Sequence, residues 1–326
     1  MDVLILSDAQ IRAAVGAADV VDSQDRAFLL AAEGDGVRSA HTHYTTFAPD
    51  GMAFVHSAVA AGETGVVFKA GTQHPRNAER DLPTVHATVT VHDPDSGRTV
   101  GVLNGTTITA LRTAGGLVSA ARALSPDRPH TVGVLGAGAQ ATEFVGLMHA
   151  LLPVDRFLIW SPRLHALGRA HLDARLADLP VEVAASPRDL CERSRTIAAC
   201  TLSRTPVIEG AWLGAGTTVL TMGSYAPDRC EIDVACSARA ARTFTDLPEQ
   251  ALRSTGPVLE AVRAGMLKEE AVHPIAEVLR GDHPGRADEA ETVVFHSNGL
   301  GVQDALLAWR AYAAARSNGI GTRVDL

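Results

Sequence analysis

The chain has 326 residues, with 29 lysines and arginines against 37 aspartates and glutamates, and a formal net charge of −8. A hydrophobic fraction of 46% and a charged fraction of 20% are typical of a globular protein and exclude a disordered or fibrous one. The acidic balance argues against nucleic acid or an anionic membrane surface as the main partner. A chain of this length can bury a large core, and we expect two domains.

The cysteines and the first residues bear on the cellular compartment. Cys191, Cys200, Cys230 and Cys236 show no Cys-x-x-Cys spacing, which favours a cytoplasmic protein with reduced thiols. The start, MDVLILSDAQ, lacks the basic segment of a signal peptide. No stretch approaches the roughly 18 continuous apolar residues of a membrane-spanning helix.

The first part of the chain predicts a helix pair followed by an antiparallel meander. Residues 8–34 carry apolar side chains at helical spacing and predict two short helices. Residues 40–60, 64–70, 84–92 and 99–104 are extended in pattern, and a Pro-Asp-Gly turn and an Asp-Pro-Asp-Ser-Gly turn interrupt them.

The pattern changes after the Pro-rich segment at 125–129, where strands begin to alternate with helices. In chain order the strands are TVGVLGAG, RFLIWS, VEVAA, TIAACT and TTVLTMG, and the helices are ATEFVGLMHALL, LHALGRAHLDARLADL and DLCERS. Such alternation indicates right-handed βαβ units, hence an α/β fold with a doubly wound, Rossmann-type parallel sheet. We expect a first domain at 1–125, a dinucleotide-binding domain at 126–301, and a last helix within 302–326 that packs back on the first domain.

A glycine-rich turn lies between the first strand and the first helix of the second domain. Gly136, Gly138 and Ala141 fit the G-x-G-x-x-G/A pattern of a dinucleotide site. The first glycine permits a tight turn, the second lets a pyrophosphate approach the backbone, and the helix N-terminus faces the phosphates.

The end of the second strand indicates which cofactor is bound. An NAD site has an acidic residue there for the ribose 2′-hydroxyl, but this chain has Ser161 and Arg163. A hydroxyl and a guanidinium suit a 2′-phosphate, so NADP(H) is favoured and NAD(H) stays possible. The alternative is that Arg163 only solvates the first turn of the next helix.

Two cations in the first domain are candidates for anion binding. Lys69 is one of two lysines in the chain and ends a strand in the segment FKAGTQHPRN. Arg112, in TALRTAGG, is predicted in the first turn of a helix, where the helix dipole disfavours a cation. An anion bound by Arg112 together with the helix end explains that position; an exposed arginine without a role is the alternative.

A series of motifs resembles the ornithine cyclodeaminase/mu-crystallin family over about residues 35–316. In order they are FKAGTQHPRN, a D-x-x-S-G turn, TALRTAGG, GVLGAGAQA, a segment from Gly223 through Pro227 and Glu231 to Asp233, and TVVFHSNGLGVQD. The resemblance implies an NAD(P)-binding Rossmann domain and a second domain that carries the substrate and forms a homodimer. Family members act on an amino or imino acid, with hydride moving to or from the α-carbon.

The resemblance also implies roles for particular residues. Lys69 and Arg112 hold the substrate carboxylate, and Lys69 is placed for proton transfer at the reacting centre. The expected cofactor contacts are Thr113, Gly136, Gly138, Ala139, Gln140, Ser161, Arg163, Thr201, Ser203 and Gly223.

Three departures from the cyclodeaminase pattern change the predicted activity. Tyr225 replaces the catalytic aspartate, and a phenol is neutral at pH 7, so it donates a hydrogen bond rather than steering an ammonium group. We do not expect Asp228, three residues on, to substitute for it. His43 stands where the family often has a carboxylate-binding arginine, and His56 where cyclodeaminases use a glutamate for the substrate amine.

These departures favour an NAD(P)H-dependent reductase or dehydrogenase of a small imino or amino acid. Lys69, with a pKa lowered by burial and by Arg112, is the expected proton donor, and Tyr225 is an expected hydrogen-bond donor near the reacting carbon. The alternatives are an ornithine or lysine cyclodeaminase with bound NAD, a biosynthetic enzyme of unusual amino acids in secondary metabolism, and a non-catalytic NADPH-binding protein.

A metal site is a minor alternative. His41, His43 and His56 could share one face of a sheet, but no carboxylate or cysteine at a useful spacing completes a set of ligands. We therefore expect no metal. The Walker A and G-x-S-x-G patterns are absent, which excludes nucleotide hydrolysis and α/β-hydrolase chemistry.

Overall fold

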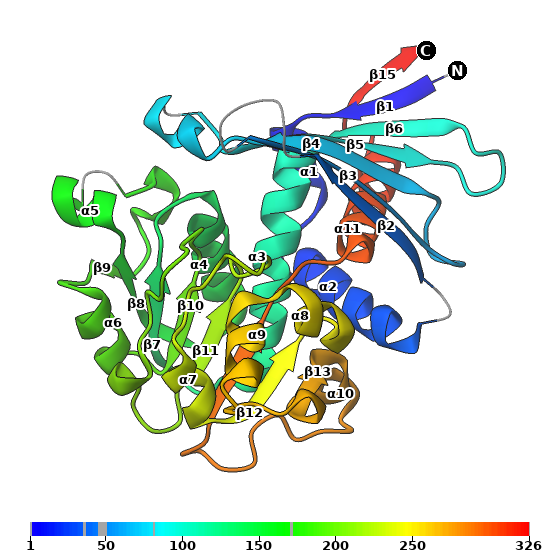
Figure 1. Cartoon of the computed structure of the whole chain (residues 1–326). Coiled ribbons are helices and arrows are strands. Elements are labelled where there is room, and N and C mark those ends of the chain that lie inside the picture. The colour runs from blue at the N-terminus through cyan, green and yellow to red at the C-terminus, as the bar shows by residue number, and fades with distance from the viewer. Residues whose placement is uncertain (1, 35–36, 45–50, 81, 170–171, 326) are drawn as a thin grey trace. The chain divides into compact units, whose positions relative to one another are not determined.

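The computed structural model describes residues 2–34, 37–44, 51–80, 82–169 and 172–325. The chain divides into two compact units: unit 1 consists of Met1–Arg112 and Leu300–Leu326, and unit 2 of Thr113–Gly299 (Figure 1). The division lies inside helix α3 (Gly105–Leu124), which is continuous, and the Pro-rich segment at 125–129 follows the end of that helix.

Unit 1 is built on a seven-stranded sheet with the order β15-β1-β6-β5-β4-β3-β2. The strands are β1 (Asp2–Leu6), β2 (Val37–Tyr44), β3 (Met52–Ala60), β4 (Val67–Gln73), β5 (Val85–His92), β6 (Thr99–Asn104) and β15 (Thr322–Asp325). Strands β2 to β6 form the predicted antiparallel meander. β1 adds to it in parallel with β6, and β15 pairs antiparallel with β1, so the two ends of the chain lie side by side (Figure 1).

Helices α11 (Gly301–Ser317) and α1 (Asp8–Ala14) contact this sheet, and α2 (Ala17–Glu33) packs on α11. Unit 1 also contains the first part of α3 and a short 3-10 helix at Pro75–Arg80. Two helices form within the segment 8–34 for which a helix pair is predicted, and α11 contacts β3, β4 and α2. On β4 the alternation of a half-buried strand points Val67 and Lys69 inward and Phe68 outward.

Unit 2 contains an eight-stranded, fully parallel sheet with the order β13-β12-β14-β11-β10-β7-β8-β9. The strands are β7 (His130–Leu135), β8 (Val154–Trp160), β9 (Val181–Val183), β10 (Thr196–Ala199), β11 (Thr218–Thr221), β12 (Ala240–Thr245), β13 (Val272–Pro274) and β14 (Thr292–His296). The run β9-β8-β7-β10-β11 has the strand order of a Rossmann fold. From β7 the chain adds strands first on one side of the sheet and then, from β10, on the other, so the strand order reverses between β7 and β10. The predicted α/β class with a doubly wound sheet is confirmed.

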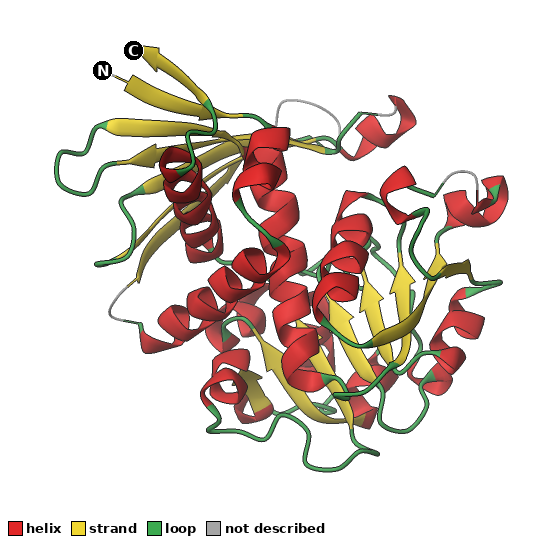
Figure 2. Ribbon diagram, turned by 180° about the vertical axis from the view of Figure 1, so that it is seen from behind, coloured by secondary structure: helices red, strands yellow, loops and turns green. Residues whose placement is uncertain are grey.

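Helices of unit 2 lie on both faces of its sheet (Figure 2), and seven of those that the structure describes follow the second part of α3. They are α4 (Ala139–Leu151), α5 (Pro162–Leu167), α6 (Pro187–Arg193), α7 (Val234–Arg239), α8 (Pro248–Ser254), α9 (Gly256–Arg263) and α10 (Ile275–Arg280). Short 3-10 helices lie at Ala174–Leu176, Gly210–Trp212 and Glu269–Ala271.

Two predictions about helices are wrong. The long helix expected at 164–179 ends at Leu167, because Gly168 takes a positive φ of 78° and closes α5. Arg112 is not in a first helical turn, since α3 already begins at Gly105. The side chain of Asn104 accepts a hydrogen bond from the Thr107 amide at 3.0 Å, which stabilises the start of the helix. The first residues of the helix are β-branched, and such residues are typical of a strand.

In the described ranges, no helix is both long and apolar enough to cross a membrane. All four cysteines are free, and Cys191 and Cys236 are buried.

Candidate functional site

An ion cluster in the interior of unit 1 gathers around Asp304, in the first turn of α11. The Lys69 ammonium lies 2.8 Å from each carboxylate oxygen of Asp304. Lys69 is 1% exposed and Asp304 is 2% exposed, so both charges are withdrawn from water. A buried ion pair of this kind fixes the position of its ammonium group, because each partner is costly to leave alone.

Two more predicted residues join this cluster. Arg112 Nε lies 3.2 Å from Asp304 Oδ1, and His56 Nδ1 lies 3.7 Å from Asp304 Oδ2. His56 reaches the cluster because it pairs with Lys69 across β3 and β4, which puts both side chains on the same face of the sheet. The structure therefore brings Lys69, Arg112 and His56 together and adds an aspartate between them.

The charges of the cluster determine which of its groups are ionised at pH 7. Burial opposes ionisation of Asp304, but the charges of Lys69 and Arg112 hold its pKa well below the usual range. Burial lowers the pKa of Lys69 to about 8, with Asp304 opposing and Arg112 adding to that shift. Burial also lowers the pKa of His56, which leaves the imidazole neutral. Two cations and one anion remain, so the cluster carries one net positive charge.

The guanidinium of Arg112 has further hydrogen-bond donors besides Nε. Its side chain is 12% exposed, and its Nε lies 3.2 Å from Asp304 Oδ1. Within the described ranges, no residue accepts a hydrogen bond from its terminal nitrogens. A guanidinium that offers two parallel N–H groups beside an ammonium is well suited to bind a carboxylate.

The turn between β7 and α4 in unit 2 fits a pyrophosphate. Gly136 has a φ of 113°, and a Cβ there would lie 2.4 Å from the Cys200 carbonyl oxygen, so only glycine fits. Gly138 is the N-cap of α4, makes no side-chain cap, and has no atom within 4 Å of where its Cβ would lie. The space beside Gly138 is therefore open, at a helix end whose first amide groups have no partner within the helix. The buried Oε1 of Gln140, one residue into the helix after Ala139, has no hydrogen-bond partner.

The end of β8 places the two residues predicted to select NADP(H). The hydroxyl of Ser161 is buried and accepts a hydrogen bond from the Leu164 amide at 3.0 Å, as the N-cap of α5. Arg163 is exposed in the first turn of the same helix. Ser161 thus has a structural use for its hydroxyl, and Arg163 is the group that reaches solvent.

The remaining predicted residues of unit 2 lie after β10 and β11. Thr201 and Gly223 are in direct contact, since a Cβ at Gly223 would lie 1.7 Å from the Thr201 carbonyl oxygen. Ser203 donates to the Thr205 carbonyl oxygen at 2.6 Å. Tyr225 is half-buried, and the Arg229 guanidinium lies 5.9 Å from the centre of its ring.

Three further predicted residues complete the set. Asp228 forms an exposed ion pair with Arg204 at 3.0 Å. Thr113 follows Arg112 in α3 and is the first residue of unit 2. His43 pairs with Phe54 in the β2–β3 ladder, and its side chain lies outside the described residues.

Sequence reasoning assigned no role to two buried carboxylates, Asp304 and Glu231. Both lie in motifs that carry the family resemblance, yet a single acidic residue gives no local sign that it is buried. For Asp304 a sign was available: a helix predicted to pack on the domain of Lys69 and Arg112 presents one acidic residue in its first turn. The chemistry of Glu231 follows from five donors that meet only in three dimensions.

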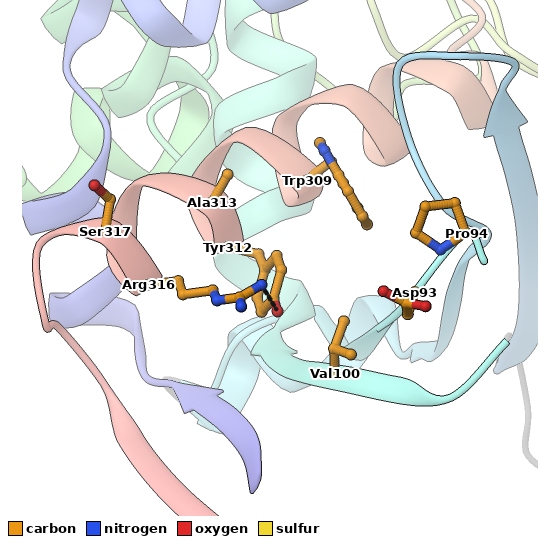
Figure 3. A pocket seen from close by; sticks show the side chains of 8 residues that line it. All are labelled: Asp93, Pro94, Val100, Trp309, Tyr312, Ala313, Arg316 and Ser317. Atoms are coloured by element: carbon orange, nitrogen blue, oxygen red, sulfur yellow. Dashed lines mark hydrogen bonds between the residues drawn. The ribbon is translucent and has the colours of Figure 1, made fainter. Parts of the chain in front are cut away.

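A separate pocket in unit 1, with a volume of about 520 Å³, lies between the second half of α11 and the β5–β6 turn (Figure 3). Its lining residues are Asp93, Pro94, Val100, Trp309, Tyr312, Ala313, Arg316 and Ser317. None of them belongs to the ion cluster, and Arg316 lies about three helical turns from Asp304. The pocket is therefore distinct from the predicted substrate residues.

No group of three or more histidine, cysteine, aspartate or glutamate side chains suited to a metal ion occurs in the part of the chain that the structure describes.

A model of the ornithine cyclodeaminase/mu-crystallin family matches residues 1–319. The chain is 33% identical to an iminosuccinate reductase of Paracoccus denitrificans over 262 residues, which cover 79% of this chain and 80% of the reductase. Its structure resembles the Δ1-pyrroline-2-carboxylate reductase of Thermococcus litoralis in complex with NADH and L-proline, with a TM-score of 0.91, 25% identity, and coverage of 98% and 100% of the two chains. It also resembles an archaeal alanine dehydrogenase dimer with bound NAD, with a TM-score of 0.86, 25% identity and full coverage of both chains.

Proposed function

The chain belongs to the ornithine cyclodeaminase/mu-crystallin family, and on that premise we propose that it is an NAD(P)H-dependent reductase of a small imino acid. The reverse reaction, oxidation of the corresponding amino acid, uses the same groups. Imine reductases and an alanine dehydrogenase among its relatives support this class of reaction.

The ion cluster of unit 1 is the observation that carries the proposal. Asp304 neutralises one of two cations, and the remaining positive charge, together with the unused donors of Arg112, matches the single carboxylate of an α-imino acid. Arg112 binds that carboxylate through its terminal nitrogens and fixes the orientation of the adjacent carbon.

Lys69 supplies the proton that the imine nitrogen needs as hydride arrives. With a pKa of about 8 its ammonium is protonated at pH 7 and is still a competent acid. Asp304 holds the ammonium in place through both carboxylate oxygens and keeps it charged against the effect of burial. Removal of the bulk water around this group strengthens each of these interactions.

Unit 2 binds the cofactor, whose nicotinamide supplies the hydride when bound. The turn at Gly136 and Gly138 receives the pyrophosphate at the N-terminus of α4, with Ala139, Gln140 and the loop residues Thr201, Ser203 and Gly223 as further contacts. Thr113 is a proposed contact as well. The exposed Arg163, with no acidic residue at the end of β8, supports a preference for NADP(H).

Tyr225 favours imino acid reduction over cyclodeamination. A neutral phenol donates a hydrogen bond but cannot attract the side-chain ammonium of ornithine or lysine. His56, neutral beside Asp304, and His43 are the proposed polar lining of the substrate site. These residues therefore favour a substrate without a second positive charge.

We also propose that the protein is a homodimer joined through the outer face of the unit 1 sheet. Ile5, Val55 and Phe68 point away from the helices and are 38%, 40% and 42% exposed. Apolar side chains on one sheet face are typical of an interface. Light scattering should show a dimer, and Phe68→Lys should shift it towards the monomer; a monomeric wild type would contradict this assignment.

Steady-state assays with a panel of substrates test the reaction itself. Purified protein is mixed with NADPH or NADH and with cyclic imino acids, or with pyruvate plus ammonia, and cofactor oxidation is followed by absorbance. The proposal predicts cofactor consumption that depends on the imino acid. Ammonia release from ornithine or lysine without net cofactor consumption would instead assign a cyclodeaminase.

A further inference from the structure

A second buried carboxylate, Glu231 of unit 2, joins two loops of the Rossmann sheet. Its Oε1 accepts hydrogen bonds from the amide and the hydroxyl of Thr201, both at 2.8 Å. Its Oε2 accepts from the amides of Met222 and Gly223, at 3.1 and 2.7 Å, and from the Ser224 hydroxyl at 3.3 Å. One side chain therefore satisfies donors that follow two neighbouring strands, β10 and β11.

The two carboxylate oxygens of Glu231 accept hydrogen bonds from different loops. Oε1 holds the loop after β10, and the same Thr201 hydroxyl accepts from the Ser203 amide at 3.3 Å, which extends the arrangement by two residues. Oε2 holds the loop after β11 just before Tyr225. The two loops also touch each other at Gly223, where no side chain fits beside the Thr201 carbonyl. The relative position of the loops thus depends on the carboxylate between them.

The charge of Glu231 is not paired with a cation among the described residues. Glu231 is fully buried, and no Lys, Arg or His of the described ranges pairs with it. Burial raises its pKa to about 7 although five donors favour the ionised form. An uncompensated buried charge is costly, and an apolar group could fill the same space. The carboxylate therefore provides what an apolar side chain could not: two acceptor ends that fix two loops.

The loops in question lie where Rossmann folds bind their ligands. Nucleotides bind at the carboxyl ends of the parallel strands, next to the reversal of strand order. Here the reversal is between β7 and β10, and the Gly136 turn that follows β7 packs against Cys200, the residue before Thr201. Glu231 thus acts on the loop adjacent to the proposed pyrophosphate turn.

We propose that Glu231 is a positioning residue for the cofactor: it sets the loops at 201–203 and 222–225 in the arrangement that receives the nicotinamide half and orients Tyr225. The assignment rests on the proposed function and gives Glu231 a role in it that does not require contact with either ligand.

The most informative variant is Glu231→Gln, which keeps the volume and removes the charge. An amide has one acceptor end and one donor end. Whichever way it is turned, its NH2 group meets at least one backbone amide, of Thr201 or of Met222 and Gly223, that cannot accept. The variant should therefore lose one loop contact without leaving a cavity.

Cofactor binding, measured by titration calorimetry with NADPH, is the primary readout. We expect the Kd of Glu231→Gln to rise about tenfold or more, with a rise in the KM for NADPH that exceeds any rise in the KM for the imino acid. Asp233→Asn is the matched control. The Asp233 carboxylate accepts hydrogen bonds from the backbone amides of Cys236 and Gly210, at 2.9 Å each, and neither of these residues belongs to the two loops. It should leave the Kd within about twofold of the wild type.

A second pair of variants covers the case in which Glu231→Gln does not fold. Thr201→Val removes the hydroxyl donor, and Thr201→Ser restores it; we expect weaker NADPH binding for the first and recovery for the second. Unchanged binding in Glu231→Gln, or equal binding in both Thr201 variants, would overturn the assignment. A wild type that binds neither NADPH nor NADH would overturn the proposed function, and the assignment with it.

Discussion

Unit 1 and unit 2 each bury a carboxylate, and the two are stabilised in opposite ways. Asp304 is surrounded by Lys69, Arg112 and His56, and its pKa lies well below the usual range. Glu231 accepts hydrogen bonds from amides and hydroxyls, and its pKa is raised to about 7. Cations balance the first charge, whereas backbone dipoles only partly offset the burial of the second.

The difference indicates what each carboxylate does. Asp304 contacts two charged side chains, Lys69 and Arg112, so in the proposed function its own charge contributes to substrate binding in unit 1. Glu231 holds backbone, so its charge determines geometry. A buried acid in a binding protein can thus set the electrostatics of a site or its shape, and its donors reveal which.

The largest effect is expected from Lys69→Ala, which removes the cation of the pair that donates the proton. Loss of a general acid typically lowers turnover by about 10²- to 10⁴-fold, and we expect imino acid reduction to fall in that range with NADPH binding unchanged. The other lysine provides the control, because Lys268→Ala lies outside the cluster and should retain full activity. Retained turnover in Lys69→Ala would remove Lys69 from the mechanism.

Asp304→Asn should have the next largest effect, on stability. Removing one partner of a buried ion cluster leaves uncompensated charge and costs about 3 to 5 kcal/mol. Denaturant unfolding measures this loss. Asp2→Asn is the matched control, because its pair with Arg323 is exposed and 3.8 Å long, and such pairs contribute about 0 to 1 kcal/mol. Equal losses in both variants would show that Asp304 is not held as the distances indicate.

The two carboxylates should respond to pH with opposite signs. The folded pKa of Asp304 is lowered, so its contribution to stability is present above pH 4 and is lost as the pH falls. The folded pKa of Glu231 is raised from 4.5 to about 7, so stability is lost as the pH rises through that window, by up to about 3 kcal/mol.

Comparison of the wild type with Glu231→Gln isolates the contribution of Glu231 ionisation to the free energy of unfolding. The wild type should lose stability relative to the variant between pH 4.5 and pH 7, as measured by unfolding in denaturant at each pH. A constant difference across that range would mean that Glu231 does not change its charge there.

The smallest effect is expected at the edge of unit 2. Arg163→Ala should weaken NADPH binding about tenfold, or roughly 1.4 kcal/mol, and leave NADH binding unchanged, because only the 2′-phosphate meets the guanidinium. Competitive binding measurements with both cofactors check this. Equal loss for both cofactors would show that Arg163 supports α5 rather than the phosphate.

The sequence predicted the regular parts of the fold because their signals are local. Alternating strands, the Gly136 turn and the last helix follow from patterns within ten to twenty residues. The strands β1 and β15 were not predicted, because they pair with each other across the two ends of the chain and β1 joins the sheet beside the distant strand β6. The start of α3 was misplaced because threonines at its first positions favour strands in isolation, and the side chain of Asn104 decides otherwise.

The candidate site divides in the same way. Lys69 and Arg112 were predicted from motifs, and His56 from its match to the position at which cyclodeaminases use a glutamate. Asp304 and Glu231 were not assigned, because their roles depend on partners far away along the chain: Lys69 precedes Asp304 by 235 residues, and Thr201 precedes Glu231 by 30. Burial and pairing at such separations are properties of the folded chain.

The pH profile of imino acid reduction tests the central claim most directly, that Lys69 held by Asp304 protonates a substrate bound by Arg112. At saturating NADPH, kcat/KM for a cyclic imino acid should fall as the pH rises through about 8, where the Lys69 ammonium loses its proton. A rate that is constant or increases across pH 8, with Lys69 intact, would contradict the account.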